Sequence, residues 1–375
     1  MSLRILQIIP TLDRAGAEKQ LVLLATGLPR EEFDVHVCAL TRGGPYEAEL
    51  RRAGIPVTVI GKRSKLDPVA YWQLEKHIAR LRPDIVQTWL FAAGSYGRVA
   101  ARRCGVRHLV DFQGATNPHR PWYEWAIDRR LARSTSAIVA VSQSVADYLV
   151  QGGIPREKIR VIYGGVALDP VTQVVNGKIR AELGIPDNAK LLAIVGRLSP
   201  EKRIKDAIWA ADLLKVCRDD VHLLVIGDGP LRERLLRYRD QIDIRDRVHF
   251  LGERSDVRRI LSELTALWLT SEHEGLPNAV LEAMAAGIPA VASDIPGNRE
   301  LVQHEQTGYR FAVGDRAALA RHTMRLLDDP ALARRLGEAG RRRAEEKFSL
   351  AGMLDSYAQL YRSLVTKDEC LMTNF

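Results

Sequence analysis

The chain has 375 residues, of which 46% are hydrophobic and 27% charged, and its formal net charge is +9 at neutral pH. This composition is typical of a soluble globular protein and excludes a chain that is disordered throughout. At roughly 100–200 residues per domain, the length predicts two domains. The basic excess is compatible with acidic partners but does not by itself indicate a nucleic-acid-binding protein, and we expect no nucleic-acid partner.

The positive charge is concentrated in the first half of the chain. Residues 1–170 contain 24 Lys and Arg against 16 Asp and Glu, whereas residues 171–375 contain 31 against 30. A basic first half suits an anionic membrane surface or an acidic substrate, but also a solvated arginine-rich surface. Basic segments around 98–107 and 129–133 could rest on a membrane as amphipathic helices.

Cysteine usage and hydropathy indicate the cellular compartment. The cysteines form no Cys-x-x-Cys pair, which argues against a disulfide framework or a zinc site and favours a reducing cytoplasm; they are Cys38, Cys104, Cys217 and Cys370. The apolar run 5–10 is too short for a signal peptide, and no stretch of about 18 apolar residues could span a membrane. We expect a cytoplasmic protein that could also attach peripherally to the inner face of the cell membrane.

Short β-branched runs alternate with longer amphipathic stretches in the first half. The predicted strands are 4–9, 34–39, 57–60, 85–88, 108–111, 137–140 and 159–162. Helical periodicity is clearest at 17–27, 46–53, 70–81 and 142–151. This alternation predicts a parallel sheet with helices on both faces.

The pattern restarts in the second half, after a segment without clear periodicity at 163–184 that we interpret as the linker and the entry to the second domain. The second set of predicted strands is 191–195, 221–226, 248–250, 266–269, 290–292 and 308–311. Their near-continuous apolar character favours a second parallel sheet. Three helices are predicted to follow, at 316–327, 330–347 and 351–365.

The most specific segment is 271–289. A strand leads into a polar loop and then into a helix predicted from about 277 to 286, which Gly287 ends. The N–H groups at the start of this helix can bind an anion, assisted by the helix dipole; they belong to Leu276, Asn278 and Ala279.

Two carboxylates accompany that helix start. Glu274 precedes it and Glu282 lies within the helix. A diphosphate on the N–H groups would place one carboxylate toward each end of the ligand. Carboxylates bind paired hydroxyls, so a sugar at one end and a ribose at the other would fit both.

Two further loops follow predicted strands. The segment 196–202 places Arg197 and Lys202 at the carboxyl end of a parallel strand, where they could bind a phosphate and stabilise a departing diphosphate. The segment 227–230, Gly-Asp-Gly-Pro, is another tight strand-to-helix turn. It is not a dinucleotide fingerprint, because Arg232 stands at the third glycine position, and an oxidoreductase is rejected.

Together these segments resemble the retaining glycosyltransferases of the GT-B superfamily, family 4. The resemblance rests on the glycine loop at 10–18, Gly196-Arg197-Leu198 with Lys202, Gly227-Asp228-Gly229-Pro230, Glu274 with Glu282, 294–300 and Thr307-Gly308. It is specific in the second half and weaker in the first.

The resemblance implies an α/β fold of two Rossmann-like domains facing a cleft, with the C-terminal helix crossing back to the N-terminal domain. Residues 1–167 with about 350–375 would form the acceptor-binding domain. Residues 168–349 would form the domain that binds a nucleotide-diphosphate-sugar donor. The family requires no metal and no other cofactor, because cationic side chains replace the metal.

The resemblance also implies residue roles. Arg197 and Lys202 would contact the diphosphate, Glu282 the ribose, and Glu274 the donor-sugar hydroxyls or a developing positive charge. The catalytic residues would be Arg197, Lys202 and Glu274. The remaining donor-binding residues would be Gly16, Gly196, Gly227, Asp228, Gly229, His273, Gly275, Leu276, Pro277 and Asn278.

The chain departs from the family pattern in the first domain and in the linker. Gln113 stands where many members have a histidine, and it can hydrogen-bond a hydroxyl but cannot act as a base. We expect Gln113 and Gly114 on the acceptor side. Gly164-Gly165 replaces a common Asn-Gly pair.

Other polar and aromatic residues leave two interpretations open. Three histidines in loops could be proposed as bases but are more often surface or hydrogen-bonded groups, with His273 the strongest candidate; they are His119, His273 and His304. The aromatic segment 121–125 could contact an acceptor or pack a helix against the core.

The sequence therefore predicts a retaining glycosyltransferase with a nucleotide-sugar donor. A UDP-sugar is favoured over a GDP-sugar, and the acceptor is a hydroxyl on a glycan or glycolipid, lipid-linked or part of a polysaccharide. We find no carboxylate nucleophile for a double displacement, so the front-face mechanism proposed for the family is expected. The alternatives are a nucleotide-sugar epimerase or phosphorylase of related fold, and a non-catalytic nucleotide-sugar-binding protein.

Overall fold

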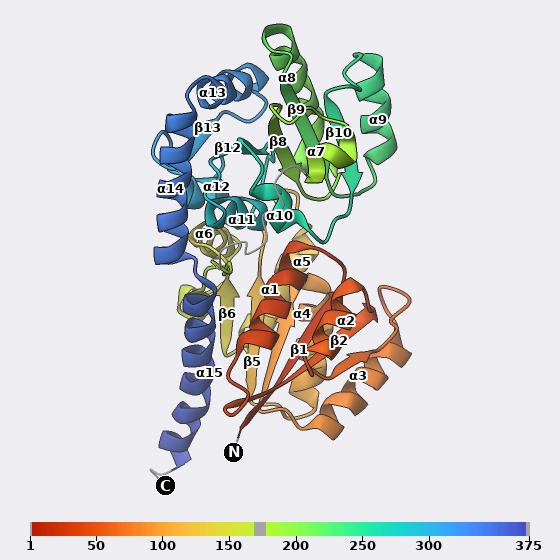
Figure 1. Ribbon diagram of the computed structural model, residues 1–375. Coiled ribbons are helices and arrows are strands. Elements are labelled where there is room, and N and C mark those ends of the chain that lie inside the picture. Colours follow the sequence, from red (N-terminus) through yellow and green to blue (C-terminus); the bar gives the residue numbers. More distant parts are fainter. Residues whose placement is uncertain (1, 169–177, 373–375) are drawn as a thin grey trace. The chain divides into compact units, whose positions relative to one another are not determined.

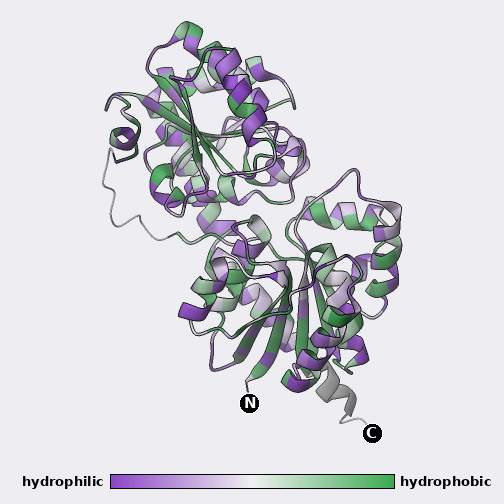
Figure 2. Ribbon diagram, turned by 90° about the vertical axis from the view of Figure 1, so that its right-hand side faces the viewer, coloured by the Kyte–Doolittle hydropathy of each residue, from purple (hydrophilic) through white to green (hydrophobic). Residues whose placement is uncertain are grey.

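The computed structural model describes residues 2–168 and 178–372 (Figure 1). The chain divides into two compact units. Unit 1 comprises residues 1–165 and 350–375, and unit 2 comprises residues 166–349. Each unit has its own sheet, and Figure 2 shows that the strands of both sheets are mostly hydrophobic whereas the helices alternate hydrophobic and hydrophilic residues. This is the pattern expected of sheets buried between layers of helices.

Unit 1 is built on a parallel seven-stranded sheet in the order β3-β2-β1-β4-β5-β6-β7. All seven predicted strands are present within a few residues of their predicted bounds. They are β1 (Leu3–Thr11), β2 (Phe33–Arg42), β3 (Val57–Val59), β4 (Ile85–Trp89), β5 (His108–Gln113), β6 (Ala137–Ala140) and β7 (Ile159–Val161).

The helices of unit 1 cover both faces of this sheet. Strand order runs outward from β1 to β3 and then from β4 to β7 in the other direction, and right-handed crossovers therefore place the two sets of connecting helices on opposite faces. The first set is α1 (Gly16–Gly27) and α2 (Pro45–Arg52). The second is α3 (Pro68–Leu81), α4 (Leu90–Arg103), α5 (Trp122–Ala132) and α6 (Gln143–Gln151).

Unit 2 repeats this topology with a parallel six-stranded sheet in the order β10-β9-β8-β11-β12-β13. The six predicted strands are present as β8 (Lys190–Val195), β9 (Val221–Ile226), β10 (Val248–Gly252), β11 (Ala266–Leu269), β12 (Ala290–Ser293) and β13 (Gly308–Phe311). The helices are α7 (Lys178–Leu183), α8 (Ile204–Cys217), α9 (Arg232–Gln241), α10 (Val257–Leu261), α11 (Asn278–Ala285), α12 (Pro296–Leu301), α13 (Arg316–Asp328) and α14 (Pro330–Lys347). The predicted α/β architecture is confirmed.

The segment interpreted as a linker, 163–184, also contains a helix. Part of the segment, 169–177, lies outside the described residues. The end of the segment forms α7, a helix that the sequence does not predict, whose Ile179 side chain is buried and whose Arg180 is ion-paired with Glu263 at 2.7 Å. A six-residue helix is too short to produce a helical period in the sequence, so only its tertiary contacts identify it.

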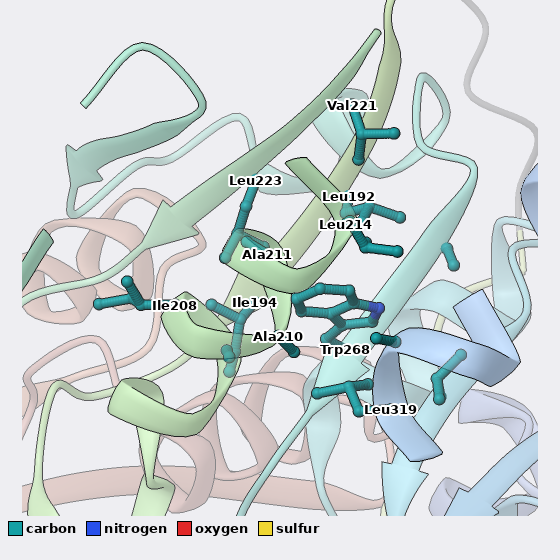
Figure 3. Close-up of a cluster of buried hydrophobic side chains, with 14 of the residues drawn as sticks. Leu192, Ile194, Ile208, Ala210, Ala211, Leu214, Val221, Leu223, Trp268 and Leu319 are labelled. Carbon is teal, nitrogen blue, oxygen red and sulfur yellow. The ribbon is translucent and has the colours of Figure 1, made fainter. Parts of the chain in front are cut away.

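The core of unit 2 is centred on Trp268 of β11 (Figure 3). Leu192 of β8 and Leu214 of α8 pack around the indole ring, and Leu319 of α13 closes the cluster from the other side. The indole Nε1 donates a hydrogen bond of 2.8 Å to Oγ1 of Thr323, so its one polar atom is satisfied although the ring is fully buried. This core fixes β11 beside β8, which positions the site described below.

The last helix, α15 (Leu350–Met372), belongs to unit 1 and packs against α1. A buried chain of hydrogen bonds joins it to the sheet. The Tyr361 hydroxyl donates to Oε1 of Gln87 at 2.6 Å and accepts from Nε2 of Gln7 at 3.1 Å, and Nε1 of Trp89 donates to Oε1 of Gln7 at 2.7 Å. The predicted return of the C-terminal helix to the N-terminal domain rests on these contacts.

We predict that Tyr361→Phe lowers the free energy of unfolding by about 1–3 kcal/mol, because it leaves buried polar groups of Gln7 and Gln87 with fewer partners. Denaturant unfolding of the whole chain measures this. Tyr123→Phe is the matched control, since Tyr123 lies on the surface of α5. Equal stabilities of the two variants would contradict a structural role for the buried chain.

Two histidines pair on neighbouring strands of unit 2. Nδ1 of His222 lies 3.0 Å from Nε2 of His249, and the rings are stacked with centroids 5.3 Å apart. Burial lowers the pKa of His249 to about 4, and the neighbouring His222 adds to this. Burial and the charge of Arg247 also lower the pKa of His222. Both rings are therefore neutral in the folded protein near neutral pH.

This pair predicts a pH-dependent stability. An unfolded histidine titrates near pH 6.5, so the unfolded state binds more protons than the folded state below that pH. The contribution of the pair to the free energy of unfolding is therefore fully present above about pH 6.5, and it is lost as the pH drops toward 4. We expect His249→Gln to reduce this slope in denaturant unfolding between pH 7 and 5. His119→Gln, on an exposed loop, should keep the wild-type slope, and identical slopes in all three proteins would refute the assignment.

Candidate functional site

Two loops leave the sheet of unit 2 where its strand order reverses. β8 pairs with β9 on one side and with β11 on the other, and because the strands are parallel their carboxyl ends lie at the same edge. Open α/β sheets bind ligands at such a reversal. The loop after β8, Gly196–Lys202, and the loop after β11, Thr270–Pro277, are called the β8 loop and the β11 loop below.

An ion pair joins the two loops. The Lys202 ammonium group contacts Oε1 of Glu274, and the Ser271 hydroxyl donates a hydrogen bond of 2.7 Å to the same oxygen. The side chains of Lys202 and Glu274 are 22% and 12% exposed, so solvent screens this pair less than a surface pair. A lysine ammonium has three N–H donors. Lys202 can therefore hold Glu274 and a further anionic oxygen together.

Backbone contacts fix the two loops against each other. The Thr270 hydroxyl donates to the carbonyl oxygen of Lys202 at 2.7 Å, and the Glu272 N–H donates to the carbonyl oxygen of Glu201 at 2.9 Å. Because these hydrogen bonds end on backbone carbonyl oxygens, they fix the path of the main chain in both loops as well as the position of a side chain. Lys202 and Glu274 are thus held at the same place by their main chains.

The turn after β9 packs directly on the β8 loop. The N–H of Leu198 donates to the carbonyl oxygen of Asp228 at 2.9 Å. A Cβ atom on Gly227 would lie 2.1 Å from the carbonyl oxygen of Gly196, and one on Gly229 would lie 2.6 Å from two backbone atoms of Leu198. Both positions therefore require glycine. Asp228 is exposed and its Oδ1 accepts the N–H of Gly229 at 2.6 Å.

Helix α11 begins at Asn278, directly after Pro277, close to the predicted position. Pro277 accepts the first intrahelical bonds from Val280 at 3.1 Å and Leu281 at 3.2 Å. The positive end of the helix dipole therefore lies at the β11 loop. Glu282 is half-buried in the second turn, and Gly287, with φ of +72°, follows the helix end as predicted.

A third loop supports the β11 loop from behind. The Ser293 hydroxyl donates to the carbonyl oxygen of Ser271, and Nδ2 of the fully buried Asn298 donates to the carbonyl oxygen of Ser293 at 2.8 Å. A Cβ atom on Gly297 would lie 2.6 Å from the carbonyl oxygen of Gly275 and 2.7 Å from that of Glu274. The sequence assigns no role to segment 294–300, and only the tertiary structure places it behind Glu274.

Arg197 and His273 complete the predicted residues of unit 2. Arg197 is exposed on the β8 loop, and within residues 2–168 and 178–366 no carboxylate pairs with it. His273 is half-buried in the β11 loop. Burial would raise the pKa of the Glu201 carboxyl, but the hydrogen bond from Ser199 and the charges of Lys202 and His273 lower it below its usual range. The loop therefore keeps Glu201 ionised.

The site residues predicted in unit 1 lie at the carboxyl edge of its sheet. Gly16 is the first residue of α1, and Gln113 is the last residue of β5, followed by Gly114. The Gln113 amide donates to Oδ2 of Asp111 at 2.7 Å, and the Thr88 hydroxyl donates to Oδ1 of the same carboxylate at 2.6 Å. Gln113 is therefore held in place by a buried carboxylate.

The structure corrects the interpretation of Arg98 as part of a membrane-facing surface. Its side chain is 1% exposed and ion-paired with Asp128, and its Nε lies 3.7 Å from Asp111. Arg120 also contacts Asp128. Burial raises the pKa of the Asp111 carboxyl, and the charge of Arg98 opposes this. An arginine in a basic stretch of sequence is expected on the surface. Arg98 is buried instead, because the carboxylates of Asp111 and Asp128 lie beside it in the folded protein.

The aromatic segment 121–125 divides between the two interpretations given above. The Trp125 ring packs against Tyr148 at a tilt of 54°, with centroids 4.9 Å apart, and occupies the space beside Gly152. Trp122 is 79% exposed. Trp125 is thus half-buried against a neighbouring helix, whereas Trp122 is on the surface.

The other histidines lie apart from the two loops. His304 accepts the backbone N–H of Arg310 at 3.0 Å, and its ring stands edge-on to that of Tyr309. His119 is exposed and holds its loop through Asn117. Within the described part of the chain, no group of three or more His, Cys, Asp or Glu side chains has a metal-binding arrangement. None of the described helices combines the length and apolar composition needed to cross a bilayer.

The fold and the site define a two-domain α/β protein of GT-B type. Residues 14–170 match the family model described as Glycosyltransferase Family 4, and residues 175–343 match the model described as Glycosyl transferases group 1. The chain is a glycosyltransferase of family 4.

Individual relatives agree with this assignment. The lipopolysaccharide core biosynthesis glycosyltransferase LpsD of Rhizobium meliloti is 27% identical over 354 residues, which cover 94% of this chain and 96% of that protein. The UDP-Gal:alpha-D-GlcNAc-diphosphoundecaprenol alpha-1,3-galactosyltransferase of Escherichia coli is 27% identical over 358 residues, covering 90% and 91%. The crystal structure of Anabaena HepE in complex with UDP-glucose has a TM-score of 0.87 at 23% identity, covering 96% and 100%, which shows the fold.

We predict that Gly297→Ala lowers transferase turnover by at least tenfold, because the added methyl group displaces the backbone of Glu274 and Gly275. Donor turnover is measured as release of nucleoside diphosphate. Gly340→Ala is the matched control in α14, where a Cβ atom would lie 3.6 Å from Cγ of Met284, an ordinary contact distance. Full activity of Gly297→Ala would show that the β11 loop tolerates displacement.

Proposed function

We propose that the protein transfers a sugar, with retention of anomeric configuration, from a nucleotide-diphosphate-sugar to a hydroxyl acceptor. A UDP-sugar is favoured as the donor and a GDP-sugar is the second choice. The acceptor is a lipid-linked or polysaccharide glycan. The reaction needs no metal, since Arg197 and Lys202 supply the positive charge that a metal would otherwise provide.

The contact between Lys202 and Glu274 is the observation on which this proposal rests most directly. It places a cation and a carboxylate side by side at the strand reversal, next to the start of α11. The cation suits the diphosphate and the carboxylate suits the hydroxyls of the attached sugar. Glu282 lies one turn into the same helix, at the end proposed to hold the ribose.

The proposed mechanism is a front-face substitution. The acceptor oxygen forms a bond to the anomeric carbon as the bond between that carbon and the diphosphate oxygen breaks. The acceptor proton passes to the departing diphosphate, so the products are the glycoside and the nucleoside diphosphate. Arg197, Lys202 and the dipole of α11 stabilise the negative charge that develops on the leaving group. Glu274 stabilises the positive charge that develops on the sugar.

We assign acceptor binding to unit 1, through Gln113 and Gly114 at the end of β5. An amide can hydrogen-bond the acceptor hydroxyl without removing its proton, which agrees with proton transfer to the diphosphate. The Escherichia coli relative, by its name, acts on a diphosphoundecaprenol-linked sugar. This supports a lipid-linked acceptor. With such an acceptor, we place the protein in the cytoplasm, at the inner face of the membrane, and the basic first half of the chain would attract an anionic lipid surface.

Arg197→Ala and Lys202→Ala should each reduce turnover by about 10²–10³-fold, as expected for removal of one charge-stabilising contact. Release of UDP from UDP-glucose without an acceptor measures this. Arg335→Ala, on the exposed side of α14, is the control for loss of a positive charge. Wild-type turnover in both site variants would exclude the proposed role of the β8 loop.

Nucleotide binding is tested by thermal unfolding with UDP, GDP and ADP. A nucleotide at 100 times its dissociation constant should stabilise the protein by roughly 2.7 kcal/mol. We expect the shift with UDP, and we expect Arg197→Ala to weaken it. A shift with GDP alone would show that the donor is a GDP-sugar and not a UDP-sugar. A shift without any turnover would identify a non-catalytic nucleotide-sugar-binding protein.

A further inference from the structure

A cavity with several cationic side chains at its wall lies in unit 2 between α8 and α9. Its volume is about 620 Å³, within the range typical of small-molecule sites. Five of its twelve lining residues are cations and one is a carboxylate; they are Arg203, Lys205, Arg234, Arg237, Arg316 and Asp206. Of the donor-site residues predicted from the sequence, none lines this cavity.

Most of this positive charge is not neutralised. Asp206 is bound by Nε of Arg203 and by Nε of Arg316, each at 2.7 Å, so the one lining carboxylate is shared by two arginines. Among the described residues, Arg234 has no carboxylate partner, and the bond made by Arg237 is to the carbonyl oxygen of Glu233 at 3.3 Å. The cavity therefore favours an anionic ligand.

The cations come from two sides of the cavity. Arg234 and Arg237 belong to α9, whereas Arg203 and Lys205 stand at the start of α8. A ligand with an anionic group at each end can reach both sides, and arginine binds phosphate bidentately. The cavity is larger than one phosphate requires, so there is room for a sugar-sized body between two phosphates. Tyr238, with the Lys205 ammonium 4.4 Å from its ring centroid, lines the same cavity.

The cavity is connected to the β8 loop through Arg203. This residue directly follows Lys202 and has a left-handed backbone, with φ of +50°, which is strained for a residue with a side chain. Its guanidinium also lies 3.6 Å from Glu272 of the β11 loop. A phosphate that binds Arg203 competes with Glu272 for it and loosens one of the contacts between the two loops.

We propose that this cavity is an effector site for a sugar bisphosphate, and that its occupation weakens donor binding. The binding part of the proposal is independent of the function proposed above. The effect on the donor rests on that function, because it acts through the loops assigned to the diphosphate. By linkage, the donor weakens effector binding by the same factor.

Isothermal titration of the full chain with fructose 1,6-bisphosphate tests binding. Arg234→Gln/Arg237→Gln should weaken it at least tenfold. Both residues are exposed and glutamine is a good helix former, so the fold should be kept, as circular dichroism can verify. Arg334→Gln/Arg335→Gln, on the exposed side of α14, removes the same charge elsewhere in the unit and should bind as the wild type does. Fructose 6-phosphate, with one phosphate, should bind at least tenfold more weakly.

Three results would overturn the site: no binding to the wild type at millimolar concentration, equal losses in the two double variants, or equal binding of the mono- and bisphosphate. Loss of binding in Arg197→Ala would place the probe at the donor site instead. If UDP does not bind at all, the proposed function fails while this titration still decides the cavity.

The effect on the donor is measured as the UDP dissociation constant at rising bisphosphate concentration. An effector raises this constant, by at least threefold here, to a plateau, whereas direct competition raises it without limit. In Arg234→Gln/Arg237→Gln the rise should need at least tenfold more bisphosphate than in the wild type. A UDP dissociation constant that is unchanged, or that rises without limit, would refute the effector role.

Discussion

The parallel pairing of β8 with β11 is the constraint on which the site in unit 2 depends. These strands are distant in sequence, yet pairing brings their carboxyl ends to one edge, and the loops that follow them meet there. The buried Trp268 ring fixes β11 between the helices that cover the sheet. Without this register, Lys202 and Glu274 would belong to unrelated loops, and the start of α11 would not lie beside them.

Close contact between backbones explains why several glycines surround the site. Gly227 and Gly229 let the turn after β9 lie against the β8 loop, and Gly297 lets the turn after β12 lie against Glu274. A side chain at any of these positions would collide with main-chain atoms, which cannot move aside as a flexible side chain can. The glycines therefore act by positioning, and a ligand contact is not required to explain them.

The two units use buried charge differently. In unit 1, Arg98 and Asp128 are paired inside the fold, with Asp111 close by, and they hold the end of β5 in place. In unit 2, Lys202 and Glu274 remain partly exposed, so they can still bind a ligand. Burying an ion pair removes both charges from water, and this unfavourable desolvation is offset only by the attraction between the two charges and by their hydrogen bonds. A charged side chain that is fully buried, such as Arg98, can act only within the fold, whereas one that is partly exposed, such as Lys202, is accessible to a ligand. This exposure depends on which residues surround the charge in space.

The sequence alone determined the alternation of strands and helices, the bounds of α11 and the residue types suited to a diphosphate. These are local properties, because periodicity, proline and glycine act over a few residues. Tertiary structure alone decided that Arg98 is buried, that α7 interrupts the linker and that Arg203 connects a cationic cavity to the β8 loop. Each of these depends on contacts between segments far apart in the chain, whose partners no local pattern specifies.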